Sequence, residues 1–127
     1  MQLSLVAFLA RDYDEAIAWF QKALGFVLLE DTDQGAGKRW VRMAPTESAD
    51  TAFLIALAVG SQVTGLGKAA AGRVAYFLET DDFATQAARM KAAGVAFEED
   101  PREEPYGTVA VFRDLYGNRW DLIQRHR

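Results

Sequence analysis

One stretch decides the fold, and it reads Tyr106-Gly107-Thr108-Val109-Ala110-Val111-Phe112-Arg113-Asp114-Leu115-Tyr116-Gly117-Asn118-Arg119-Trp120-Asp121-Leu122-Ile123-Gln124. The β-branched and aromatic residues on both sides of residues 114–118 are typical of pleated, half-buried strands. Gly117 and Asn118 tolerate a positive φ, which a tight turn between two strands requires. The stretch therefore predicts a closing β-hairpin.

The second strand of this hairpin presents one acidic side chain among large apolar neighbours. Side chains alternate across a strand, so Trp120, Leu122 and Gln124 share one face, and Asp121 and Ile123 share the other. What Asp121 faces is therefore the main functional question that the hairpin raises.

Composition excludes several classes of protein. The chain has 127 residues, a formal net charge of -4 and no cysteine. This length predicts one domain, and the lack of cysteine excludes disulfides and thiol chemistry. Scattered basic residues argue against a nucleic-acid surface, and no apolar run reaches the roughly 18 residues of a membrane span. Since the N-terminus lacks signal-peptide features, we expect a cytoplasmic protein.

The chain repeats one pattern of elements. The first copy predicts a strand at residues 3–10, a helix between Asp12 and Gly25, and strands at residues 26–30, 39–44 and 51–59. The second copy predicts a strand at residues 73–78, a helix that Asp81 or Asp82 caps and Gly94 ends, a strand at residues 95–99, a polar loop at residues 101–105 and the closing hairpin. Leu5 aligns with Arg73 and Gly25 with Gly94, so the offset is 68 (73 − 5) to 69 (94 − 25) residues.

This repeat predicts an α+β fold of two βαβββ modules, each of which leaves one sheet face that needs cover. We assign residues 1–59 to module one, residues 60–72 to a flexible glycine-containing connector, and residues 73–127 to module two. Together they make a single domain over residues 1–127.

Two segments resemble the vicinal oxygen chelate superfamily, which includes glyoxalase I, extradiol dioxygenases and bleomycin-resistance proteins. Residues 112–124 resemble the closing hairpin of that family, and residues 11–26 resemble its first helix. The resemblance covers nearly the whole chain and implies the two-module fold, in which the curved mixed sheets of the modules form a cleft. It also implies a homodimer, with modules that pair within one chain or swap between two. Because this fold hosts many functions, it does not by itself decide the activity.

The resemblance implies four positions for a divalent metal, one on the first and one on the last strand of each module. Three of them fall on Leu5, Leu54 and Arg73, which do not coordinate a cation, and only Asp121 keeps a carboxylate. We therefore expect no metal and no catalytic residue. The alternative is a metal-dependent glyoxalase-type lyase or dioxygenase with ligands in a different register.

Arg73 and Asp121 occupy equivalent positions in the two strands, so they are candidate ligand-binding residues. One interpretation is an internal salt bridge that replaces the metal. The other is a ligand whose anionic group binds the Arg73 guanidinium while Asp121 orients it.

Aromatic side chains are the second resource for a ligand site, because binding pockets are mostly apolar and planar ligands stack on rings. Each of these rings is also a candidate for the hydrophobic core. The candidates are Trp40, Phe53, Tyr106, Phe112 and Trp120.

Residues 98–105 carry five acids and one base around two prolines. This composition fits a solvated connector, or an acidic rim that attracts a cationic ligand. The part from Pro101 to Gly107 resembles a segment of bleomycin-resistance-like proteins, which sequester a basic, partly planar ligand. The sequence thus predicts a protein that binds and sequesters a planar, cationic small molecule, with a metal-free enzyme as a further reading.

Overall fold

The computed structural model describes residues 1–126, which form two compact units that divide between Leu66 and Gly67. This division lies inside the connector predicted at residues 60–72. That segment is not irregular throughout, because two short 3-10 helices, η2 (Gly60–Gly65) and η3 (Ala69–Gly72), occupy most of it. No helix among the described residues is long and apolar enough to cross a membrane.

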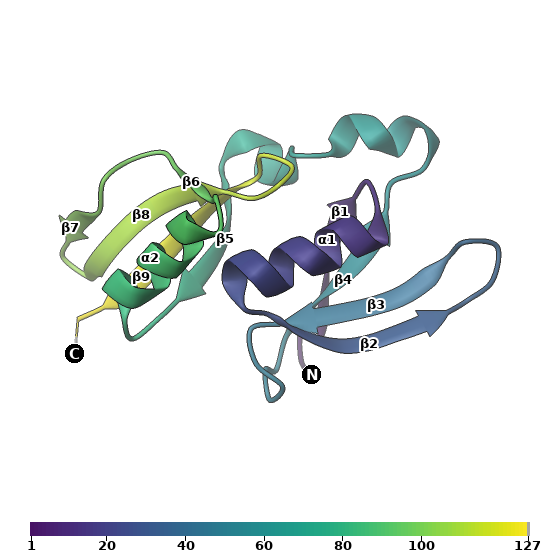
Figure 1. Ribbon diagram of the computed structural model, residues 1–127, viewed down its shortest axis with the longest axis horizontal. Coiled ribbons are helices and arrows are strands. Elements are labelled where there is room, and N and C mark those ends of the chain that lie inside the picture. The colour runs from purple at the N-terminus through teal and green to yellow at the C-terminus, as the bar shows by residue number, and fades with distance from the viewer. Residues whose placement is uncertain (127) are drawn as a thin grey trace. The chain divides into compact units, whose positions relative to one another are not determined.

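The first unit is a four-stranded sheet with one helix (Figure 1). Its strands run in the order β1-β4-β3-β2, with β1 parallel to β4 and the other neighbours antiparallel. The bounds are β1 Leu5–Ala10, α1 Tyr13–Trp19, η1 Phe20–Leu24, β2 Val27–Asp33, β3 Arg39–Ala44 and β4 Ala52–Leu57.

The helix of the first unit begins and ends where the sequence predicts. The Asp12 side chain accepts a hydrogen bond from the Glu15 backbone N–H at 2.8 Å, which satisfies a free donor of the first turn. After Trp19 the helix widens into the π-helical turn η1, and Gly25 ends it with a φ of 69°. The buried face of this helix packs on the sheet, where the rings of Phe8 and Phe20 lie 4.9 Å apart in an edge-to-face contact.

The second unit repeats this arrangement with five strands. Its main sheet runs β5-β9-β8-β6, with β5 parallel to β9, and β7 pairs with β8. The bounds are β5 Val74–Glu79, α2 Phe83–Ala92, β6 Ala96–Phe97, β7 Arg102–Glu104, β8 Gly107–Arg113 and β9 Arg119–Arg125. Asp82, one of the two predicted caps, accepts from the Thr85 N–H and begins α2.

Both sheets place the first strand on one side of the last strand and the next-to-last strand on its other side, so the α+β class and the repeated module are confirmed. One local prediction was wrong. The polar loop expected at residues 101–105 contains the strand β7, in which Arg102 lies opposite Val109 of β8. Its side chains are polar on both faces, so no alternation marks it as a strand.

Candidate functional site

The closing hairpin of the second unit has one face that packs on α2 and one that does not. On the helix face, the Gln124 Oε1 atom accepts a hydrogen bond from the Phe83 N–H at 2.7 Å, and Trp120 stacks on Phe112 with ring centroids 5.5 Å apart. Because side chains alternate along β9, Asp121 lies on the opposite face. The face assignment made from the sequence is therefore correct.

A cavity of about 380 Å³ lies on this opposite face, at the pairing of β5 with β9. Its lining residues are Arg73, Val74, Phe77, Arg119 and Asp121. Phe77 lies directly across from Asp121 in the parallel register, and 64% of its surface is exposed. Arg73 is exposed and makes no ion pair with any described residue. The cavity thus combines a free guanidinium, an apolar ring and a carboxylate.

Asp121 is the buried acid of this cavity. Its exposed fraction is 7%, and its Oδ1 atom is buried without a hydrogen-bond partner among residues 1–126. Burial raises the pKa of the Asp121 carboxyl above its ordinary value, Arg102 and Arg119 oppose this change, and Glu99 adds to it. The salt bridge between Arg73 and Asp121 that the sequence left open does not form, although both residues line one cavity.

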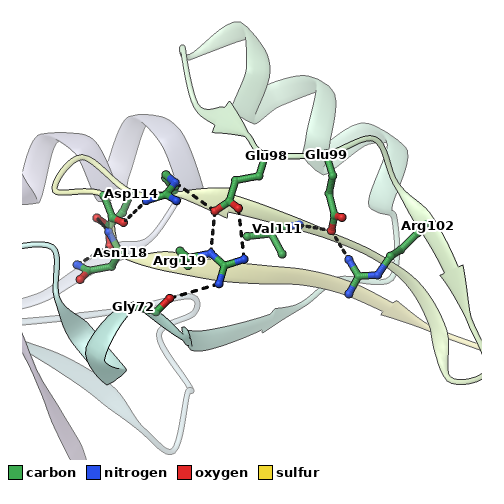
Figure 2. A network of polar contacts seen from close by, with 10 residues as sticks. Gly72, Glu98, Glu99, Arg102, Val111, Asp114, Asn118 and Arg119 are labelled. Carbon is green, nitrogen blue, oxygen red and sulfur yellow. Dashed lines mark hydrogen bonds and ion pairs between the residues drawn. The ribbon is translucent and has the colours of Figure 1, made fainter.

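Apart from Arg73, the charged side chains around Asp121 on this face form ion pairs, several of which are seen in Figure 2. Glu98 accepts from Arg113 at 3.1 Å and from Arg119 at 2.9 Å, and Arg119 also donates to the Gly72 carbonyl. Arg102 pairs with Glu99 and Glu104. The bond from Arg119 lowers the pKa of Glu98 below its ordinary value. Three arginines are therefore engaged with three glutamates, and none of them bonds to Asp121.

Replacing Asp121 by asparagine should stabilise the protein by about 1–2 kcal/mol at neutral pH, because it removes a buried charge with an unpartnered oxygen. The folded protein holds the Asp121 proton more tightly than the unfolded chain does. The contribution of Asp121 to the free energy of unfolding of the wild type therefore falls as the pH rises from 3.8, its ordinary pKa, through the raised pKa of the folded protein. Urea unfolding of both proteins at neutral and acid pH measures the difference, which should shrink at acid pH.

The matched control is Glu47→Gln, which removes one negative charge from an exposed loop residue. It should change the free energy of unfolding by no more than about 0.5 kcal/mol at either pH. A destabilised Asp121→Asn protein, or a gain that is the same at both pH values, would show that the carboxylate is satisfied in solution.

The other candidate residues are not among those that line this cavity. Phe112 and Trp120 are 0% and 1% exposed in the core under α2, and Phe53 packs against Phe8 and Phe20 in the core of the first unit. Tyr106 is 42% exposed at the turn before β8. For Phe53, Phe112 and Trp120, the core interpretation therefore describes their surroundings better than a ligand site does.

Trp40 lines a separate cavity of about 450 Å³ within the first unit. This cavity lies beside β3, the end of β4 and η2, where Leu54 and Leu57 supply apolar surface and Lys38 and Gln62 supply polar groups. Lys38 makes no ion pair with another described residue. The cavity can receive a flat apolar group against the indole ring.

Three residues of the second-unit cavity, Val74, Phe77 and Arg119, were not among the candidates from sequence. Phe77 follows Tyr76 in an apolar strand, and only the parallel register with β9 places it beside Asp121. Arg119 comes directly after the turn, so its cavity position depends on the same register. Residues 74–78 are apolar or aromatic throughout, so no alternating pattern in the sequence marks the face on which Phe77 lies.

The metal positions that the resemblance implies do not fit a cation. Leu5 and Leu54 offer no donor atom, Arg73 is cationic, and no group of three metal-binding side chains of the His, Cys, Asp or Glu type occurs in the described part of the chain. Asp121 is thus a lone carboxylate beside arginines.

Comparisons with known proteins place the whole chain. Residues 2–122 match the family described as the Glyoxalase/Bleomycin resistance protein/Dioxygenase superfamily. An uncharacterized protein of Shewanella frigidimarina is 47% identical over 121 residues, which cover 94% of this chain and 90% of that protein. The crystal structure of UcmS2 has a TM-score of 0.82 at 27% identity, over 97% of each chain. That of TnmS3, an antibiotic binding protein from Streptomyces sp. CB03234, has a TM-score of 0.78 at 28% identity, over 99% of this chain and 97% of TnmS3.

Proposed function

Because the chain belongs to the Glyoxalase/Bleomycin resistance protein/Dioxygenase superfamily, we propose that it binds and sequesters a small molecule without transforming it. The observation that carries this proposal is the cavity on the open face of the second unit. There, the unpaired Arg73, the exposed ring of Phe77 and the buried carboxylate of Asp121 line one space of about 380 Å³. Pockets of this size with a few polar groups among apolar surface are typical of small-molecule sites.

The likeness to TnmS3 supports an antibiotic-type ligand, because that protein is described as antibiotic binding and is similar over nearly its full length. The second cavity supports a planar ligand, since Trp40 and neighbouring aliphatic side chains offer a flat apolar wall. We therefore propose planar natural-product antibiotics as the class of ligand. A homodimer and a cytoplasmic location stay predictions from the sequence.

Arg73 and Asp121 lack the usual partners of an enzymatic centre. A lyase or dioxygenase of this superfamily would need oxygen and nitrogen ligands for a metal, and the equivalent positions hold Leu5, Leu54 and Arg73. A binding protein needs no such set. The donor chemistry of these positions thus supports binding over metal-dependent turnover.

A thermal-shift screen tests the proposal. Planar antibiotics from several structural classes should include compounds that raise the melting temperature by several degrees, because a ligand that binds only the folded state stabilises it. Hits should be recovered unchanged after incubation, as chromatography can show.

Calorimetry with nickel, zinc, manganese and iron(II) supplies the opposing test. Binding of any of these ions at micromolar affinity and unit stoichiometry would contradict the proposal and favour the lyase or dioxygenase. The proposal is also contradicted if no compound in the screen stabilises the protein while a glutathione adduct is turned over in the presence of a metal ion. That pair of results would favour the lyase.

A further inference from the structure

Asp121 is the carboxylate left over on the open face of the second unit. Its neighbours Arg102 and Arg119 already donate to glutamates, and its Oδ1 atom receives no hydrogen bond within the described residues. A buried acceptor without a donor is costly, and native proteins rarely leave one unsatisfied. Since Asp121 lines a cavity, a bound molecule can bring the missing donor.

We propose that this cavity selects a ligand with a protonated nitrogen, which donates its N–H to the Asp121 carboxylate. The inference rests on the proposed function and names the chemical class of its ligand. Glu98, Glu99 and Glu104 pair with Arg102, Arg113 and Arg119, so the two charged side chains of the cavity that form no ion pair with a described residue are Asp121 and Arg73. Figure 2 shows the ion pairs of Glu98 and Glu99. A protonated nitrogen can donate to the open acceptor of Asp121, and a charge-assisted hydrogen bond is stronger than a neutral one.

The proposed cation site differs from the one that the sequence indicated. The acidic rim at residues 98–105 was one candidate, but Glu98, Glu99 and Glu104 are held in ion pairs and Glu103 accepts from the Thr108 hydroxyl at 2.7 Å. The rim acids thus hold the segment on the sheet. Asp100, the fifth acid of the rim, is exposed and does not line the cavity, so the acid that can meet a ligand in the cavity is Asp121 on β9.

Phe77 and Arg73 define the rest of the ligand. Phe77 is across from Asp121, so an apolar ring next to the ligand's ammonium group would contact the exposed phenyl ring. Arg73 lies four residues before Phe77 in the chain, which corresponds to roughly 13 Å between their Cα atoms in an extended strand. A ligand with an acceptor at its far end would satisfy this arginine as well, so the preferred class is dipolar: a planar molecule with a protonated amine at one end and a carboxylate at the other.

Three matched probes test the inference by amide NMR titration of the isotopically labelled protein at millimolar concentrations. They share one ring: para-(aminomethyl)benzoate carries both charges, para-methylbenzylamine only the cation, and para-methylbenzoate only the anion. We expect the amide signals of Phe77 and Asp121 to shift with the first two probes. The affinity order should be the dipolar probe, then the amine, then the acid.

Two variants assign the contacts. Asp121→Asn keeps the shape and removes the charge, and it should weaken the amine at least about tenfold, as loss of a charged hydrogen bond does. Arg73→Gln should weaken only the dipolar probe and the acid. Glu47→Gln, with the same charge change at an exposed loop residue of the first unit, should leave all three affinities unchanged. Asp121→Asn is expected to be the more stable protein, so lost binding would not reflect unfolding.

The inference is overturned if the acid binds more tightly than the amine, if Asp121→Asn binds the amine as well as the wild type does, or if no probe shifts Phe77 and Asp121. The proposed function has a separate test. If an antibiotic stabilises the wild type and Asp121→Asn equally, the result supports the proposed binding function and contradicts the assignment of Asp121 as the cation site.

Discussion

Asp114→Ala is expected to lower the free energy of unfolding by about 3–5 kcal/mol, since it leaves several buried donors without an acceptor. The Asp114 carboxylate is 6% exposed and lies inside the turn between β8 and β9. Its Oδ1 atom accepts from the Tyr116 and Asn118 backbone N–H groups, and its Oδ2 atom accepts from the Asn118 amide and from the Trp120 indole N–H at 2.9 Å. Urea unfolding followed by fluorescence measures the loss.

The same network reaches the segment before β5. The Asn118 Oδ1 atom accepts from the Ala69 backbone N–H at 3.0 Å, so the turn and η3 are tied together (Figure 2 shows Asp114 and Asn118). Asp114→Asn should give an intermediate loss, because an amide keeps one acceptor and turns a donor toward the remaining N–H groups. Asp50→Ala, at an exposed position, is the control and should change stability by no more than about 0.5 kcal/mol. If Asp114→Ala were as stable as this control, water would have to accept all the hydrogen bonds that the carboxylate accepts in the wild type.

Gly67→Ala should cost about 3–5 kcal/mol, because a methyl group has no room at this position. A Cβ atom there would lie 2.0 Å from the Tyr116 backbone oxygen, and the φ of Gly67 is +74°. The close contact is with backbone, which cannot rotate away as a side chain can. The expected result is a lower melting temperature and a weaker connection of the segment before β5 to the turn of the closing hairpin.

Gly37→Ala separates the two causes. Gly37 has a similar φ of +80°, but nothing lies within 4 Å of the position of its Cβ atom. Its replacement should therefore cost only the strain of a left-handed residue, about 1–2 kcal/mol. Equal losses at both positions would mean that the segment at Gly67 moves aside without cost, and that the contact with Tyr116 is not fixed.

Local chemistry made most of the fold predictable. Asp12, Gly25 and Asp82 act as the helix caps and stop that their residue types predict, and the closing hairpin forms where Gly117 and Asn118 place it. The two-fold repeat then supplied the topology, since each copy carries the same order of elements. The pleat of β9 also gave the face of Asp121 before any partner was known.

What the sequence could not supply was pairing at long range. The register between β5 and β9 sets Phe77 beside Asp121, and it depends on packing across 44 residues of chain (121 − 77). The sequence also could not predict the partners of Glu98. Only the pairing of the strands in the sheet brings Arg113 and Arg119 to it. Ring positions such as Phe112 and Trp120 were ambiguous because cores and ligand sites use the same side chains.

The strand order has a consequence for how the chain is made. In each sheet the strand synthesised last, β4 or β9, occupies an inner position between the strand synthesised first and the strand that directly precedes it in the chain. β1 and β5 therefore have no strand partner in their sheet until 47 (52 − 5) or 45 (119 − 74) further residues have left the ribosome. Since the first unit is complete before the second begins, the two halves can mature one after the other, and a message cut short near residue 118 would lack the middle of a sheet rather than its border.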